Sequence, residues 1–454
     1  MTSRGWTLDC GWHNRERHVG DCLCLRACLA FSLVAHIHTF DNGLRLVATA
    51  VAHARSVSIS VYLRAGARYE LPDDAGLSHF AEHLCFKGTE RRPLPQDIAV
   101  EIDSMGGTIN AITDRELTVY YAKVTPDYAG QALDVLSDMI RNSLYHEPEI
   151  ERERGVILEE LAASEDSPAE QSGLLLDRLL WPGQPLGRDI AGTPATVSAI
   201  SPQRLVEYYQ TQYVANATVI SIAGAIDEQE TAELVERALG DWGAGEPAAL
   251  MPHEDEPRGD RVGTIAKETE QVHISFGMRS TSYFDEDRHA VDLLSILLGE
   301  GMSSRLFARL REELGLCYDI HTFVSHLSDT GMFGVYAGVD PGKAREAVCE
   351  IAAELKRARD PVTPEELGRA QRLVRSRLQL RMEDTHAVSA WHGSQEVLDL
   401  PRLTPEQSIA RADAVTVEDI ERAAARLITD DGLHVALAGP VDGESIMAGV
   451  SVDG

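Results

Sequence analysis

The chain has 454 residues, more than one hydrophobic core usually contains, so we expect at least two domains. Its composition, with 44% hydrophobic and 25% charged residues, is typical of ordinary globular proteins. The 42 Lys and Arg residues against 72 Asp and Glu residues give a formal net charge of -30, which argues against nucleic acids and anionic membranes as partners and favours cationic polypeptides.

The first 36 residues show no helix or strand pattern, and we interpret them as a disordered extension or as sequence upstream of the true start codon. Four of the seven cysteines lie there: Cys10, Cys22, Cys24 and Cys28. Their spacing lacks paired C-x-x-C units, which argues against a metal cluster, and the odd cysteine count predicts a reducing compartment rather than a disulfide framework. The apolar stretch 22–35 contains Arg26 and is too short to span a bilayer. It is also a weak signal peptide, so export is an alternative to the cytoplasmic location that we expect.

Internal similarity indicates a duplicated domain. Three segments recur 215 residues further along the chain: 57–64 matches 272–279, 121–126 matches 336–341, and 222–227 matches 437–442. Within each copy, strands such as 57–64 and helices such as 77–86 and 128–141 favour an α+β domain in which helices pack on a mostly antiparallel sheet. The acidic, proline-containing stretch 243–260 predicts a linker. We therefore expect a first domain at 37–242 and a second, homologous domain at 261–454.

A predicted helix of the first copy carries the sequence His79-Phe80-Ala81-Glu82-His83. Histidines four residues apart leave the same face of a helix, so both imidazoles can bind one cation. A catalytic zinc site needs such imidazoles, a carboxylate ligand, an open position for water and a separate carboxylate that takes the proton of this water. Glu82, placed as in the H-x-x-E-H order of inverzincins, suits the last role. The alternative is a pair of ordinary surface or core histidines.

A comparison with the second copy of the domain favours the metal site over ordinary histidines. At the same offset, residues 79–83 correspond to residues 294–298, where Leu294, Leu297 and Leu298 replace the two histidines and the glutamate. A face that is apolar in one copy and ionisable in the other is expected to be buried. Burying two imidazoles and a carboxylate without a partner would be costly, and a bound metal would supply that partner.

Residues 149–161 predict a helix that begins after Pro148 and offers a third metal ligand. Glu153 and Glu160 are seven residues apart and so project from one face of this helix, whereas Glu159 points about 100° away. Helix phase alone does not choose between Glu159 and Glu160. The alternative is a charged helix that simply faces solvent.

These residues resemble the pitrilysin family of zinc metallopeptidases, in particular the branch that includes the mitochondrial processing peptidase and its bacterial relatives. In that family a glutamate ligand follows the second histidine by 77 residues, which here reaches Glu160. The resemblance implies one zinc ion per chain, held by His79, His83 and Glu160. It also implies that Glu82 is the catalytic base and that Glu153 lies beside the metal and tunes it.

The resemblance extends to residues that would contact a substrate. Residues 106–113 resemble the edge strand that pairs with the substrate backbone, which implies contacts at Asn110, Ala111 and Ile112. Arg311 and Tyr318 of the second copy match an Arg and Tyr pair that closes over the metal site and stabilises the oxyanion. Glu170 matches a position that binds a basic side chain of the substrate.

The expected activity is that of a zinc metalloendopeptidase acting on peptides or unfolded segments enclosed in an acidic chamber, with a preference for sites near basic residues. The resemblance also implies a homodimer, because two domains make half of the family's four-domain assembly. A heterodimer with a separate chain is an alternative. The main competing function is a non-catalytic structural or assembly subunit of the same fold.

Overall fold

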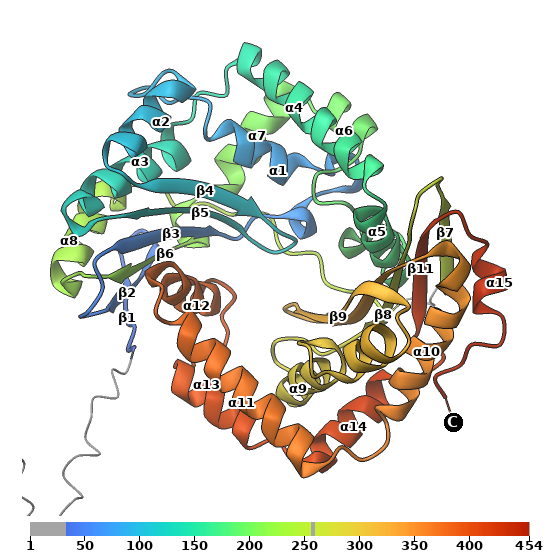
Figure 1. Ribbon diagram of the computed structural model, residues 1–454. Helices are drawn as coiled ribbons and strands as arrows, with labels where there is room; N and C mark the ends of the chain where they lie inside the picture. Colours follow the sequence, from blue (N-terminus) through green and yellow to red (C-terminus); the bar gives the residue numbers. More distant parts are fainter. Residues whose placement is uncertain (1–32, 256–258, 454) are drawn as a thin grey trace, which may run out of the picture. The chain divides into compact units, whose positions relative to one another are not determined.

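The computed structural model describes residues 33–255 and 259–453, which contain two mixed sheets covered by helices (Figure 1). The predictions made for residues 1–32, including the cysteine-rich segment, therefore lie outside the described residues. Residues 33–453 belong to one compact unit. The predicted fold class, two homologous α+β domains, is confirmed.

The first sheet has six strands in the order β1-β2-β6-β3-β5-β4, and only the β2–β6 pair is parallel. Its strands are β1 (His36–Thr39), β2 (Arg45–Ala50), β3 (Val57–Leu63), β4 (Thr108–Thr113), β5 (Thr118–Val124) and β6 (Thr218–Gly224). The helices of this half are α1 (Leu77–Leu84), α2 (Pro95–Ser104), α3 (Ala129–Asn142), α4 (Glu147–Asp166), α5 (Pro168–Leu180), α6 (Pro194–Ala199), α7 (Pro202–Gln212) and α8 (Glu228–Leu239).

The second sheet has five strands in the order β7-β11-β8-β10-β9, and here the β7–β11 pair is parallel. Its strands are β7 (Val262–Ala266), β8 (Val272–Arg279), β9 (Cys317–His326), β10 (Gly331–Val339) and β11 (His434–Gly439). The helices of this half are α9 (Arg288–Gly299), α10 (Ala344–Arg357), α11 (Pro364–Arg381), α12 (Thr385–Val397), α13 (Pro405–Asp413), α14 (Val417–Leu427) and α15 (Gly443–Met447).

The duplication is visible in the element boundaries. Helices α3 and α10 begin at residues 129 and 344, α7 and α14 at 202 and 417, and α8 and α15 at 228 and 443, so members of each pair begin 215 residues apart. Strands β3 and β8 begin at 57 and 272, with the same offset. The halves therefore share much of one order of elements, each around its own hydrophobic core.

The two halves exchange one equivalent helix. Helix α5 of the first half packs on β8 and β11 of the second sheet, and α12 of the second half packs on β3 and β6 of the first sheet. A buried serine pair lies at each contact, with 2.9 Å between the Oγ atoms of Ser172 and Ser275 and 2.9 Å between those of Ser389 and Ser60. Each pair satisfies hydroxyl groups that burial removes from water. The exchange ties the halves together through their helices.

The stretch predicted as a linker contacts both halves. Residues 243–255 and 259–260 contain neither helix nor strand. The buried Arg68 donates to the carbonyl oxygen of Met251 at 2.8 Å and forms ion pairs with Glu116 at 2.5 Å and with Asp329 of the second half at 2.7 Å. The backbone N–H of His253 also donates to Asp329, at 2.7 Å. This stretch is thus fixed between the halves, and the domain boundaries proposed from the sequence stay a prediction.

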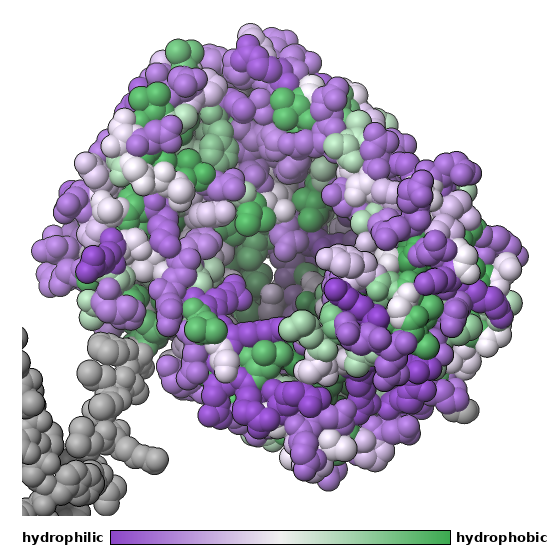
Figure 2. All heavy atoms as spheres, viewed as in Figure 1, coloured by the Kyte–Doolittle hydropathy of each residue, from purple (hydrophilic) through white to green (hydrophobic). Residues whose placement is uncertain are grey.

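One face of the surface is largely hydrophilic, as the content of charged residues in the sequence predicts. Hydrophilic residues cover most of the face seen in Figure 2. Among the described residues, none of the helices combines the length and the apolar character needed to cross a bilayer.

Candidate metal centre

Helix α1 presents the H-x-x-E-H motif because its other face belongs to the core. Phe80, Ala81 and Leu84 are buried in the first hydrophobic cluster. With 3.6 residues per turn, this leaves His79 and His83 on the opposite side, where each is partly exposed. The helix packs against α4 and β4, which supply the other residues of the site.

The start of α1 is fixed by Glu70, whose side chain is buried. Its Oε1 accepts a hydrogen bond from the backbone N–H of Ser78 at 2.6 Å, and its Oε2 accepts one from Gly76 at 3.0 Å. These bonds satisfy N–H groups that the first helical turn leaves without partners. Gly76 precedes the helix with φ of 94°, a left-handed conformation that favours glycine. Burial raises the pKa of Glu70 to about 7.

The three predicted metal ligands converge. The Nε2 atoms of His79 and His83 are 3.2 Å apart, and Oε2 of Glu160 on α4 lies 3.9 Å from the first and 3.7 Å from the second. One ligand atom from each residue can be chosen so that all three lie within 4.8 Å of one another, a grouping that includes Glu160 and not Glu159. Two imidazoles and one carboxylate are the donor set of a catalytic zinc site, so the residues fit this metal.

Burial favours the neutral form of His79. Burial, with a smaller contribution from the neighbouring His83, lowers the pKa of His79 to about 4. A neutral imidazole is the form that binds a metal.

Glu153 lies on the far side of His83 from the cluster. Its Oε2 is 3.2 Å from Nδ1 of His83, and its Oε1 forms an ion pair with Lys87 at 2.8 Å. A carboxylate on Nδ1 fixes the ring and leaves Nε2 directed at the metal position. His79 differs, because its buried Nδ1 has no hydrogen-bond partner among the described residues.

Glu82 is held by β4. The hydroxyl of Thr113 donates a hydrogen bond to Oε2 of Glu82, and burial raises the pKa of this carboxyl group. Glu82 is absent from the group of convergent ligand atoms, so it remains available for proton transfer. The sequence did not single out Thr113, Lys87 or Glu70. A signal existed only for Thr113, which ends the predicted edge strand.

The predicted substrate strand is an edge strand. Strand β4 pairs with β5 and, among the described residues, has no second neighbouring strand. Ile112 is 55% exposed and Asn110 is also exposed, whereas Ala111 is buried against the sheet. Ala111 could therefore contact another chain only through its backbone, whereas Asn110 and Ile112 could also do so through their side chains.

The structure does not bring Arg311 and Tyr318 to the metal cluster. The Arg311 guanidinium stacks 4.6 Å from the ring centroid of Tyr318 and 4.8 Å from that of Phe307, and Tyr318 is 76% exposed. No contact of either residue within the described part of the chain involves His79, His83 or Glu160. Glu170 is exposed in the first turn of α5, likewise without a contact to the cluster.

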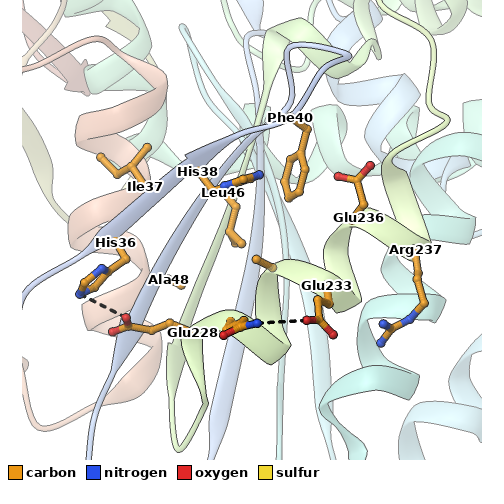
Figure 3. A pocket seen from close by; sticks show the side chains of 12 residues that line it. His36, Ile37, His38, Phe40, Leu46, Ala48, Glu228, Glu233, Glu236 and Arg237 are labelled. Atoms are coloured by element: carbon orange, nitrogen blue, oxygen red, sulfur yellow. Dashed lines mark hydrogen bonds and ion pairs between the residues drawn. The ribbon is translucent and has the colours of Figure 1, made fainter.

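A separate pocket of about 680 Å³ lies between β1 and α8 (Figure 3). His36 forms an ion pair with Glu228 at its edge, at 3.2 Å, and Glu233 and Glu236 line the helix side. It contains none of the residues that the motif predicts, so it does not belong to the metal centre.

Two family descriptions match the chain. "Insulinase (Peptidase family M16)" matches residues 46–194, and "Peptidase M16 inactive domain" matches residues 199–374. The chain belongs to peptidase family M16, which confirms the resemblance found in the sequence.

Relatives support the same assignment, and solved structures share the fold. An uncharacterized zinc protease of Streptomyces coelicolor is 35% identical over 412 residues, covering 89% of each chain, and the uncharacterized zinc protease YmxG of Bacillus subtilis is 34% identical over 397 residues, covering 87% of this chain and 96% of that one. A protease from Helicobacter pylori shares the fold with a TM-score of 0.83 at 20% identity, over 90% of this chain and 100% of that chain. A chain of complex III2 from Candida albicans does so with 0.80 at 17% identity, over 91% and 99%.

Proposed function

We propose that this protein is a zinc-dependent endopeptidase that hydrolyses peptides or unfolded segments. The observation that carries the proposal is the convergence of His79, His83 and Glu160 beside an unligated Glu82. The names of the relatives, zinc proteases, support the metal and the reaction. Zinc bound by these three side chains would act as a Lewis acid and acidify a water molecule.

Side chains of the protein would then transfer the proton of this water. Glu82 takes a proton from the attacking water and returns it to the leaving amine. Its pKa is raised by burial, which makes the carboxyl group a better proton carrier near neutral pH than an exposed glutamate. The Thr113 hydroxyl holds the carboxylate toward the cluster, and Glu153 keeps His83 oriented.

An extended substrate would add to the free edge of β4. Its backbone would pair with residues 110–112, and the exposed Ile112 would contact a side chain. The net charge of -30 and the exposed Glu170 favour substrates with Arg or Lys near the cleaved bond.

A second subunit would complete the site. Arg311 is half-buried and stacks on the exposed Tyr318, and neither has a partner in the metal cluster of its own chain. In a homodimer they would close over the partner's metal and stabilise the oxyanion. Mixing Glu82→Gln and Tyr318→Phe proteins tests this, because a mixed dimer would regain one intact site. No regain despite demonstrated subunit exchange would exclude shared sites, and a sedimentation mass including a different chain would indicate a heterodimer.

The decisive test of the activity is Glu82→Gln. This variant should keep one zinc per chain by elemental analysis and lose peptide hydrolysis, because the amide cannot accept the proton. Glu159→Gln, one residue before the proposed ligand and outside the cluster, is the matched control and should retain both. Peptidase activity that survives Glu82→Gln, or that resists chelators, would exclude the proposal.

A non-catalytic structural subunit is the second candidate, favoured by the shared fold of the complex III2 chain. The retained donor set argues against it. Purified protein with neither zinc nor peptidase activity would support this alternative. A cytoplasmic location stays a prediction.

A further inference from the structure

A cavity of about 540 Å³ lies where the two halves meet, away from the metal centre. Tyr62 of β3 in the first half lines it, and the remaining wall comes from the second half, including α9, α11, α12 and α13. Small-molecule sites have volumes of about 300–1,000 Å³ and occur preferentially at domain interfaces. It shares no residue with the metal cluster.

The wall of this cavity is partly apolar. Leu293, Val374 and Trp391 line it, and the indole of Trp391 is fixed by a hydrogen bond from Nε1 to the carbonyl oxygen of Leu403 at 2.8 Å. A rigid aromatic ring beside aliphatic side chains is suited to the apolar body of a ligand. An inorganic ion alone would leave this surface unused.

The cavity also contains two arginines, Arg288 and Arg381, in a chain whose net charge is -30. Within the described residues, neither Arg288 nor Arg381 forms an ion pair with a carboxylate. The partly buried Arg288 donates to the carbonyl oxygen of Tyr283 at 2.9 Å and to Nε2 of His289 at 3.3 Å. A guanidinium has five N–H groups, so three remain for a further acceptor. Arg381 is exposed at the edge of the cavity.

The single carboxylate of the lining does not offset these charges. Asp292 is engaged by His326, whose Nε2 lies 3.0 Å from Oδ1, and its Oδ2 is 3.8 Å from Nδ1 of His289. His289 accepts from Arg288, so its Nδ1 carries the proton and faces Asp292. Burial lowers the pKa of Arg288, and the opposing attraction of Asp292 is too weak to reverse this effect.

We propose that this cavity is a binding site for a small organic anion, a carboxylate with an apolar body. Arg288 and Arg381 bind the carboxylate, since a guanidinium matches its two oxygens with paired N–H donors. Trp391, Leu293 and Val374 pack against the body. The site shares no residue with the metal cluster, so we expect it to be independent of peptide hydrolysis.

Isothermal titration of the full chain with 4-phenylbutyrate tests the proposal. Its uncharged amide and inorganic phosphate are the comparison ligands, the first lacking the charge and the second the apolar body. We expect the carboxylate to bind, and both comparison ligands to bind about tenfold more weakly or not at all. Absence of carboxylate binding at millimolar concentration, or equal binding of the amide or of phosphate, would overturn the proposal.

Arg288→Gln and Arg381→Gln should each weaken carboxylate binding by about tenfold or more. Arg372→Gln is the matched control, because Arg372 is an exposed arginine on α11 outside the cavity. Unchanged thermal unfolding midpoints would show that the variants are folded. If Arg288→Gln does not fold, Arg381→Gln and the amide decide the matter. Carboxylate binding that survives the folded Arg variants unchanged would also exclude the site.

Discussion

Helices α1 and α9 occupy equivalent places in the two halves and have opposite chemistry. In α9, Leu294, Leu297 and Leu298 are buried in the core of the second half. In α1 the corresponding positions carry His79, Glu82 and His83, which converge with α4 and β4 instead. The comparison teaches that one helix position serves either as core or as part of a candidate metal centre, depending on which ionisable groups neighbouring elements supply.

The two helices also begin differently. Helix α1 starts after Gly76, whereas the equivalent residue 215 positions later, Val291, lies inside α9. The left-handed Gly76 and the buried Glu70 cut α1 short and fix its first turn. This sharp start places His79 within the first turn of the helix, one residue after Ser78, whose N–H donates to Glu70.

The largest expected effect comes from making α1 resemble α9. His83→Leu, which copies Leu298, should reduce the metal content from one per chain to background and abolish peptide hydrolysis, because two donors do not hold the ion. Elemental analysis and a peptide cleavage assay measure both. His53→Leu, at an exposed position, is the control and should change neither. Full metal content in His83→Leu would contradict the assignment.

A smaller effect is expected from Glu153, which contacts the proposed ligand His83 and not the metal itself. Glu153→Gln removes the negative charge beside Nδ1 of His83 and should weaken zinc binding about 10–100-fold, measured by competition with a chelator. Glu151→Gln, on the exposed face of the same helix, should leave the affinity unchanged. Equal affinities of the two variants would show that Glu153 does not tune the metal.

The sequence predicted those site residues whose spacing places them on one face of a helix. Residues 79 and 83 share one helix face, and the internal duplication is enough to identify their leucine counterparts in the second copy. Choosing Glu160 over Glu159 required the family spacing, because helix phase leaves adjacent positions open. Glu70, Lys87 and Thr113 were missed, since their contacts depend on how loops and strands fold back onto α1 and α4.

The fold class was predictable because each copy repeats the same order of strands and helices. The exchange of α5 and α12 was not, since the order of elements along the chain does not state which sheet a helix covers. Arg311 and Tyr318 remain predictions for the same reason. The role that we propose for them depends on a second subunit, which helix and strand patterns do not position.

The reverse substitution in α9 should cost stability without creating a site. Leu298→His places an imidazole among buried apolar side chains, so we expect the free energy of unfolding to fall by about 1–3 kcal/mol with no added zinc. Urea unfolding and elemental analysis measure these effects. Leu380→His, at an exposed position of α11, should change stability by less than about 0.5 kcal/mol. A second zinc per chain would refute the view that neighbouring elements decide the chemistry.

The smallest effects test whether the exchanged helices are equivalent. Ser389→Ala leaves the buried Ser60 hydroxyl without its 2.9 Å partner, and we expect a cost of about 1–2 kcal/mol in unfolding free energy. The double variant with Ser60→Ala should cost less than the sum of the single changes, because no hydroxyl is then left unpaired. The same cycle on Ser172 and Ser275 should give a similar coupling, since the contact has the same length. Coupling in only one pair would show that one helix exchange, not both, holds the halves together through its serines.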